Sequence, residues 1–183
     1  GDDAAGRRGD QRVDAVGAPV EFFPLTAVEA ALGDGHEGEV CEDVECTAHW
    51  DIWPGTIVVD EEKDWAYIFY RKVYCESGLF RFHHVGHSIA VWKNFPETPE
   101  RPVFENVDEY PTLFFSEEGE AGFGSAAVVV DKLVYVYGCE KEEDDLTKPC
   151  HLARVPIADI LDKSAWTFFD GMGHWLPDSR ASR

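Results

Sequence analysis

Four strand-like runs occur twice along this chain, in the same order. Each run is rich in Val, Ile, Tyr, Phe or Trp, and turn-forming segments separate neighbouring runs. Val128 follows Ile57 by 71 residues and Ala153 follows Ala90 by 63, a difference that loop lengths absorb. The first set comprises WPGTIVVD, WAYIFYRKVY, HSIAVWKN and the segment from RPVFEN to TLFF, and the second comprises GSAAVVVD, KLVYVYGCE, CHLARVP and WTFFDG. The repeat predicts two antiparallel units of four strands.

These two units predict an all-β fold built from β-propeller blades. A four-stranded antiparallel sheet with apolar residues on both faces cannot stay soluble alone, and radial stacking of similar sheets buries both faces. A closed ring needs at least about four blades, so a chain with about two to three blades is a partial propeller. Such a chain is a piece of a longer protein or depends on another chain for closure. A β-sandwich made from the same eight strands is the alternative.

Composition restricts both the partners and the domain boundaries. The 16 Lys and Arg residues against 36 Asp and Glu give a formal net charge of −20, which repels nucleic-acid backbones and anionic membrane surfaces. No apolar run approaches the ~20 residues that span a bilayer, so membrane insertion is not expected. Residues 1–19 have almost no large apolar side chain and predict a disordered linker. Residues 20–183 form the predicted propeller domain, in which TAVEAAL indicates a short helical turn.

Five cysteines bear on the cellular compartment. Cys41 with Cys46, and Cys139 with Cys150, lie close in sequence around loop-like residues and predict two disulfides, which leaves Cys75 over. The second bridge would join the two ends of one acidic hairpin loop. This pattern predicts an exported protein, secreted or held at the cell surface or in the periplasm. The alternative is five reduced, partly buried thiols in a cytosolic protein.

The sequence predicts no metal site and no cofactor. Cys41 and Cys46 lack a matching second pair of Cys or His residues. The HHVGH segment contains His83, His84 and His87, but its Gly and the preceding alternation indicate strand and turn, whereas the helical metalloprotease motif needs continuous helix. We therefore interpret these histidines as loop and strand residues, with His87 able to reach a ligand or water.

The candidate binding site follows from propeller geometry. The innermost strand of each blade lines the central channel, and the loop before it lies at the channel mouth. Aromatic faces stack on sugar rings while polar groups bond hydroxyls, so acids beside aromatics predict carbohydrate binding. The first such loop, TAHWDIWPG, offers His49, Trp50, Asp51 and Trp53, and the second, SEEGEAGFGS, offers Glu117, Glu118, Glu120, Phe123 and Ser125. The predicted substrate-binding residues are His49, Trp50, Trp53, His87, Phe123 and Ser125.

Asp51 and Glu120 are the predicted catalytic pair. Glycoside hydrolysis needs two carboxyl groups, about 5–5.5 Å apart in retaining enzymes and about 6.5–9.5 Å apart in inverting ones. Each of these acids precedes a predicted innermost strand, and innermost strands converge on a propeller axis. The alternative is that both are solvated loop acids.

The order of WPGTIVVD, IFYRKVY, GHSIAVW, FGSAAVVVDKLVYVYGC, HLARVP and AWTFFDG resembles the family catalogued as domain of unknown function 4185, over about residues 48–175. The resemblance implies a five-bladed β-propeller related to arabinanase-like and levansucrase-like glycosidases, some of them endo-acting arabinanases. Nothing before Val20 matches the acidic first blade that such proteins usually have. No catalytic residue is carried over from that family.

Three functions remain open from the sequence. The first is an exported glycoside hydrolase that acts on an arabinan-like or related polysaccharide. The second is a non-catalytic propeller that binds a glycan or a protein through the same aromatic residues. The third is a fragment with no activity of its own. The sugar, the linkage and the oligomeric state are not specified by these patterns.

Overall fold

The computed structural model describes residues 22–36, 40–41, 44–45, 48–76, 81–95, 97–104, 110–116, 121–139 and 149–179. The predicted linker, residues 1–19, lies outside the described residues, and so does the side-chain pairing of Cys41 with Cys46. The domain boundary and that disulfide therefore stay predictions.

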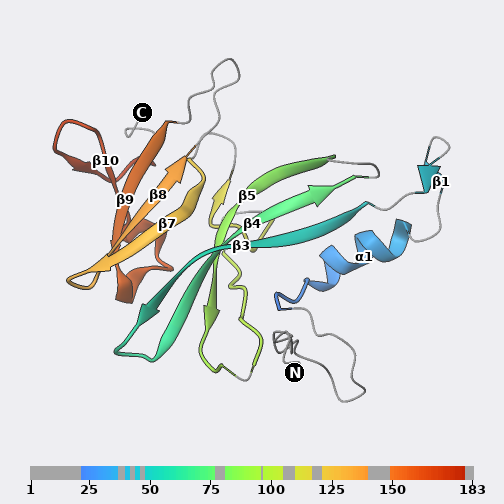
Figure 1. Ribbon diagram of the computed structural model, residues 1–183, viewed down its shortest axis with the longest axis horizontal. Coiled ribbons are helices and arrows are strands. Elements are labelled where there is room, and N and C mark those ends of the chain that lie inside the picture. The colour runs from blue at the N-terminus through green and yellow to red at the C-terminus, as the bar shows by residue number, and fades with distance from the viewer. Residues whose placement is uncertain are drawn as a thin grey trace, which may run out of the picture.

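The described chain is built mainly from antiparallel β-strands, with one helix (Figure 1). The helix and the first strands are α1 (Ala27–His36), β1 (Val40–Cys41), β2 (Val44–Glu45), β3 (His49–Asp60), β4 (Trp65–Cys75), β5 (Phe82–Trp92) and β6 (Phe115–Ser116). The remaining strands are β7 (Phe123–Val130), β8 (Leu133–Cys139), β9 (Cys150–Pro156), β10 (Thr167–Phe169) and β11 (Trp175–Leu176), with single 3₁₀ turns at Ile157–Asp159 and Lys163–Ala165. The predicted all-β class is confirmed.

The first sheet consists of β3, β4, β5 and β6 in sequence order, each antiparallel to its neighbour. The hairpin between β3 and β4 is closed by Asp60, whose carboxylate accepts hydrogen bonds from the backbone N–H groups of Glu62 and Lys63. Strand β3 begins at His49, so the segment predicted as a channel-mouth loop is strand from His49 onward and pairs with β4 as far as Pro54. That loop prediction is wrong, because Trp50 and Ile52 continue the β-forming run N-terminal to Trp53.

The second sheet has the order β11-β10-β9-β8-β7 and is again an antiparallel meander. Asp131 and Lys132 both have positive φ, 49° and 64°, at the two-residue turn between β7 and β8. Cys139 and Cys150 lie directly opposite each other on β8 and β9 and form a disulfide, as predicted, while Cys75 is a free thiol.

The fourth strand of each unit departs from the sequence prediction. The segment from RPVFEN to TLFF contributes only Phe115–Ser116 as strand, because Pro102 and Pro111 lack the N–H group that ladder pairing requires. In the second sheet WTFFDG forms only the short strand β10, and β11 adds a fifth strand beyond it. The two sheets are not closed into a ring in the described chain.

The main core lies between the two sheets, which do not exchange strands. Phe69, Ile89 and Phe115 from the first sheet pack against residues of the second sheet in one cluster. Trp166 is fully buried in this cluster, and its indole N–H donates a hydrogen bond to the carbonyl of Ile160. The first strands of the two sheets, β3 and β7, run next to each other (Figure 1). The sheets therefore meet face to face, with a shared apolar interior.

Helix α1 is joined to the first sheet on the side that faces away from the second sheet. Thr26 and Glu29 form a capping box, in which each side chain accepts a hydrogen bond from the other residue's backbone N–H. The buried carboxylate of Glu29 is paired with Lys72 of β4 and with Arg101. Within the described residues no helix is long and apolar enough to cross a membrane.

Candidate functional site

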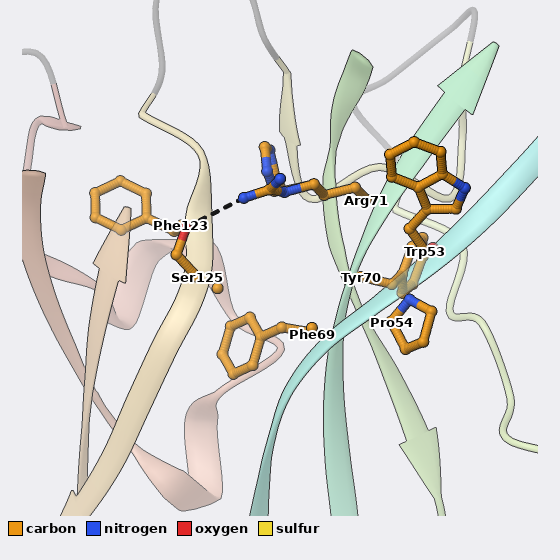
Figure 2. A pocket seen from close by; sticks show the side chains of 10 residues that line it. Trp53, Pro54, Phe69, Tyr70, Arg71, Phe123 and Ser125 are labelled. Atoms are coloured by element: carbon orange, nitrogen blue, oxygen red, sulfur yellow. Dashed lines mark hydrogen bonds between the residues drawn. The ribbon is translucent and has the colours of Figure 1, made fainter. Parts of the chain in front are cut away.

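A pocket with a volume of about 260 Å³ opens between the two sheets (Figure 2). Its walls come from β3, β4 and β5 of the first sheet and from β7 of the second. The lining residues are Trp53, Pro54, Gly55, Phe69, Tyr70, Arg71, His87, Phe123, Gly124 and Ser125. The pocket thus sits where the first strands of the two sheets meet, and it draws polar groups from both.

Two glycines allow the sheets to approach at this point. A Cβ atom on Gly55 of β3 would lie 2.9 Å from the carbonyl oxygen of Gly124 on β7. Gly124 has φ +111°, and a Cβ there would lie 2.7 Å from the Cβ of Phe69. Both strands also carry a bulge here, between Pro54 and Ile57 on β3 and between Phe123 and Ala126 on β7. Bulges of this kind bend a strand and redirect its side chains, which is how a pocket forms in an otherwise packed interface.

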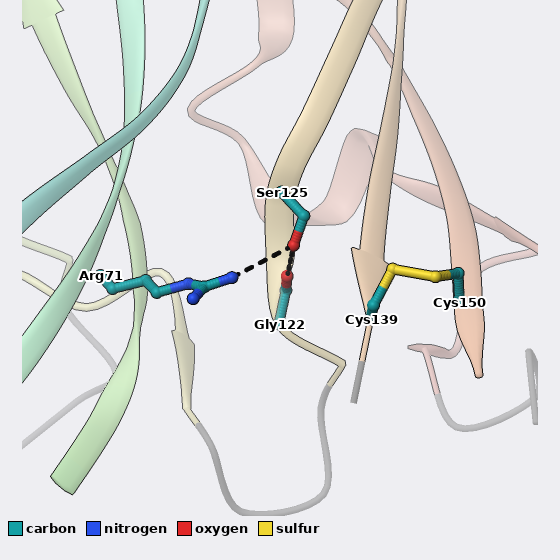
Figure 3. Close-up of a disulfide and its surroundings, with 5 residues drawn as sticks. All are labelled: Arg71, Gly122, Ser125, Cys139 and Cys150. Carbon is teal, nitrogen blue, oxygen red and sulfur yellow. Dashed lines mark hydrogen bonds between the residues drawn. A yellow bond between two sulfur atoms is a disulfide. The ribbon is translucent and has the colours of Figure 1, made fainter. Parts of the chain in front are cut away.

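Arg71 reaches across the pocket from β4 to β7 (Figure 2). Its guanidinium donates a hydrogen bond to Ser125 Oγ over 3.3 Å, and Ser125 Oγ in turn lies 3.5 Å from the carbonyl oxygen of Gly122 (Figure 3). Among the described residues no carboxylate forms an ion pair with Arg71. The guanidinium therefore retains hydrogen-bond donors and a positive charge for an acceptor in the pocket.

His87 brings a buried imidazole to the same pocket. Only 7% of the residue is exposed, and its Nε2 atom has no hydrogen-bond partner among the described residues. Burial lowers the pKa of His87 to about 4, and the charges of Arg71 and His84 contribute in the same direction. The ring is therefore neutral at physiological pH, with one nitrogen able to accept a proton or a hydrogen bond. A buried polar atom without a partner is costly unless a ligand or water satisfies it.

Aromatic side chains lie beside this polar centre. The Trp53 ring is 36% exposed and packs against Phe82, with ring centroids 5.0 Å apart, and against His84 at 5.7 Å. These three residues come from β3 and β5 and lie on the face of the first sheet that also carries Arg71. The Trp53 indole therefore presents an aromatic surface next to hydrogen-bonding groups.

Four of the six predicted substrate-binding residues, Trp53, His87, Phe123 and Ser125, line this one pocket. Phe123 is fully buried and packs against Phe115 and Phe168, so it supports the wall and offers no stacking face.

The other two predicted binding residues lie elsewhere. Trp50 contacts Tyr74 and Tyr110 and lies 4.4 Å from the Lys72 ammonium, in the cluster that holds α1. His49 lies beside Asp51 and Cys75 near the start of β3. Neither residue lines the pocket.

The predicted catalytic pair is not assembled in the described chain. Asp51 is half-buried, and its carboxylate accepts a hydrogen bond from the Cys75 thiol over 3.4 Å. Glu117, Glu118 and Glu120 lie outside the described residues. The pairing of Asp51 with Glu120 therefore stays a prediction.

Arg71 is the charged residue of the pocket, and the sequence patterns did not select it. It occupies the same face of β4 as Tyr67 and Phe69, which both belong to the core between the sheets. In WAYIFYRKVY every second residue from Tyr67 faces the core, so the alternation places Arg71 on the same face. A cation at such an inward-facing position indicates a paired or functional charge.

The comparison with protein families corrects the resemblance drawn from the strand motifs. The matching family model is not domain of unknown function 4185, so that identification is wrong. Runs of β-branched and aromatic residues between Gly and Asp turns recur in many all-β families, and they do not separate one family from another. No curated protein matches the chain. The family model that does match covers residues 26–183, which include α1 and both sheets. The chain therefore belongs to the family described as domain of unknown function DUF5005.

Proposed function

We propose that this protein binds a carbohydrate in the pocket between the two sheets and that it is a non-catalytic glycan-binding protein. The observation that carries the proposal is the buried, unpartnered Nε2 atom of His87 next to the Arg71 guanidinium and Ser125. A sugar hydroxyl both donates and accepts, so one hydroxyl can satisfy the imidazole nitrogen and the guanidinium together. The half-exposed Trp53 ring supplies the stacking face.

The local charge in the pocket favours a glycan that carries a carboxylate, such as a uronic acid. Among the described residues that line the pocket, Arg71 is the only Lys or Arg and no Asp or Glu is present, so the local charge is positive although the chain as a whole is acidic. An anion bound there would accept a charge-assisted hydrogen bond from the guanidinium, which is stronger than a hydrogen bond between neutral groups. A neutral arabinan-like sugar would use the same hydroxyl contacts without that ion pair.

The exported location and the propeller architecture belong to the same proposal. The Cys139–Cys150 disulfide is compatible with an extracellular environment. Two consecutive antiparallel meanders packed face to face, with adjacent first strands, are the arrangement of neighbouring propeller blades. Exposed apolar residues on those first strands, Ile57, Val59, Val128 and Val130, offer a surface that further blades would cover. Crystallography of the full-length gene product tests this, because further meanders around one axis, from the same chain or from another, are expected and a closed two-sheet sandwich contradicts it.

Binding to a panel of acidic and neutral oligosaccharides, measured by isothermal titration calorimetry, tests the pocket. Trp53→Ala removes the stacking face and Ser125→Ala removes a polar contact, so each substitution is expected to weaken binding by about tenfold or more. Arg71→Met selectively weakens binding to uronic acid oligomers. The matched controls are Trp175→Ala and Arg154→Met, which change a stacked Trp–Arg pair on the second sheet outside the pocket. Binding that survives all pocket substitutions and is lost in the controls would place the site elsewhere.

The second candidate is a glycoside hydrolase in which Asp51 and Glu120 act as the carboxyl pair. The observation that favours it is the position of Asp51, two residues before Trp53 on β3 and on the same side of that strand. A reducing-end assay on arabinan and uronic acid polymers separates the candidates. Cleavage that disappears in Asp51→Asn and in Glu120→Gln, with binding retained, supports the enzyme. Binding without cleavage across the panel supports the glycan-binding protein.

A further inference from the structure

A second cluster of chemically reactive side chains lies on the first sheet, outside the pocket. His49 and Cys75 are directly opposite each other on β3 and β4, and Asp51 lies two residues further along β3 on the same face. One imidazole nitrogen, one carboxylate oxygen and the thiol sulfur lie within 4.8 Å of one another. Cross-strand pairing fixes these positions, because opposed residues in an antiparallel ladder hold their Cβ atoms about 4.5–5.5 Å apart.

Two separations between these atoms are close to those of a tetrahedral metal centre. Asp51 Oδ2 lies 3.7 Å from His49 Nε2 and 3.4 Å from Cys75 Sγ. Zinc bonds to nitrogen and oxygen at about 2.0–2.2 Å and to sulfur at about 2.3 Å, so its ligand atoms lie about 3.3–3.6 Å apart at the tetrahedral angle. The imidazole nitrogen and the thiol sulfur lie within 4.8 Å of each other, so rotation of these two side chains about their own bonds is what brings the three ligand atoms around one ion.

We propose that His49, Asp51 and Cys75 form a zinc-binding site. A set of one imidazole, one carboxylate and one thiolate suits a borderline-soft ion such as zinc and does not suit Mg²⁺ or Ca²⁺, which prefer oxygen ligands. Three protein ligands leave the fourth tetrahedral position open to water or to an oxygen of a ligand. His49 is exposed while Asp51 and Cys75 are half-buried, so the open position faces solvent. The site does not depend on the proposed glycan pocket, and it makes Asp51 a metal ligand.

The test uses the chain with Cys41→Ser and Cys46→Ser, purified without reductant. This background leaves Cys75 as the one thiol outside the Cys139–Cys150 disulfide. Titration with Co²⁺, read by absorption, is expected to give a thiolate-to-cobalt charge-transfer band together with the visible bands of tetrahedral Co²⁺, saturating at one ion per chain. Competition with Zn²⁺ is expected to remove both signals, because zinc binds such sites more tightly than cobalt.

Single substitutions assign the ligands. Cys75→Ser removes the charge-transfer band, and Asp51→Asn and His49→Gln each weaken Zn²⁺ binding by about 100-fold or more, since even outer-shell partners are worth about 10- to 100-fold in metal affinity. The matched control is His83→Gln, an exposed histidine on the same sheet that pairs with Glu76. Thermal unfolding with EDTA present confirms that each variant is folded. Absence of the charge-transfer band in the background chain, or an unchanged Zn²⁺ affinity in folded Asp51→Asn and His49→Gln, overturns the proposal.

Discussion

A neutral imidazole beside a guanidinium is the electrostatic centre of the pocket. The His87 ring stays neutral because burial disfavours its charged form, and the positive charge of Arg71 disfavours that form further. In the proposed function, the pairing of a hydrogen-bond acceptor with a fixed positive charge selects ligands that carry hydroxyl or carboxylate groups. The proposed specificity therefore rests on the chemistry of these two residues.

The titration of His87 is a direct prediction from this environment. Its NMR resonances are expected to titrate with a pKa of about 4, well below the ordinary value of 6.5. As the pH drops, His87 is protonated in the unfolded chain before it is protonated in the folded one. The free energy of unfolding therefore decreases as the pH drops from 6.5 towards 4. Arg71→Met should raise the pKa of His87, because it removes one of the repelling charges. A pKa near 6.5 in the folded protein contradicts a buried ring.

Glu29 shows the opposite case, a buried carboxylate that keeps its charge. Burial raises the pKa of Glu29, but hydrogen bonds from Arg101 and Lys72 outweigh that effect and hold the pKa at about 2, against an ordinary value of 4.5. Arg101 also donates to Thr112 Oγ1 and to the Tyr70 hydroxyl, so the network joins α1 to three parts of the first sheet and its loops. Loss of the Glu29 carboxylate leaves the buried cations of Lys72 and Arg101 without their anionic partner.

Glu29→Gln is therefore expected to lower the free energy of unfolding by about 3–5 kcal/mol near neutral pH, the cost of leaving buried charges unpaired. The difference in free energy of unfolding between Glu29→Gln and the wild type has its full size above about pH 4.5. It shrinks as the pH falls towards 2, because the pKa of Glu29 is lower in the folded state than in the unfolded state. Urea denaturation across this pH range measures it. The control is Glu100→Gln, whose exposed pair with Lys93 contributes about 0–1 kcal/mol. Equal effects of the two substitutions would show that the buried network contributes nothing beyond a surface pair.

At the scale of elements, the approach of β3 to β7 depends on glycine. Gly124 combines a positive φ with a neighbour that leaves no room for a Cβ, whereas Gly171 has φ +76° and nothing within 4 Å of an added Cβ. The two positions therefore separate the cost of backbone conformation from the cost of packing.

Gly124→Ala is expected to lower the free energy of unfolding more than Gly171→Ala. The left-handed backbone alone costs about 1–2 kcal/mol at either position, and the contact with Phe69 adds about 1–3 kcal/mol at Gly124. Urea denaturation of the two single variants gives the comparison. Similar values for both would mean that the sheets adjust freely at this contact.

The disulfide ties the open ends of β8 and β9 and supplies another prediction at this scale. Replacing both Cys139 and Cys150 with Ser is expected to lower the free energy of unfolding by about 2–3 kcal/mol in the chain-entropy model for a loop of ~10 residues. Chemical denaturation without reductant measures the change. An unchanged midpoint would indicate that the acidic loop is already closed without the bond.

The strands that formed as predicted are the ones with long β-branched and aromatic runs. Strands β4 and β8 follow their sequence patterns closely, since alternation and propensity agree there. Strand β5 begins at Phe82, before the predicted run at His87, so the interpretation of HHVGH as partly loop is wrong because this segment pairs with β4. The fourth strand of the first unit did not form as predicted, because Pro102 and Pro111 interrupt pairing in a stretch that is otherwise apolar. At the site, the sequence selected Trp53, which lines the pocket but lies within β3 and not in a loop before it. Arg71 was missed because its meaning depends on which face of β4 meets the second sheet.

At the scale of the whole molecule, two meanders share a core, and a pocket lies at the interface between them in the described part of the chain. Consecutive strands make each sheet, so the pocket is built by contact between two units that are distant in sequence. The repeat in the sequence indicates the two units. The bulges on β3 and β7, and the close contacts at their glycines, form only where the two sheets meet and cannot be seen in the repeat. Arg71 and His87 are neighbours on the first sheet, and Ser125 of the second sheet joins them only when both units fold.

The most direct test of the central claim is chemical-shift mapping of the ¹⁵N-labelled protein with an acidic oligosaccharide that it binds. The account predicts the largest changes at the backbone amides of Arg71, His87 and Ser125 and at the indole N–H of Trp53. The indole N–H of Trp175, on the second sheet outside the pocket, is predicted to stay in place. Changes confined to residues outside the pocket, with the signals of His87 and Trp53 unmoved at saturation, would contradict the account.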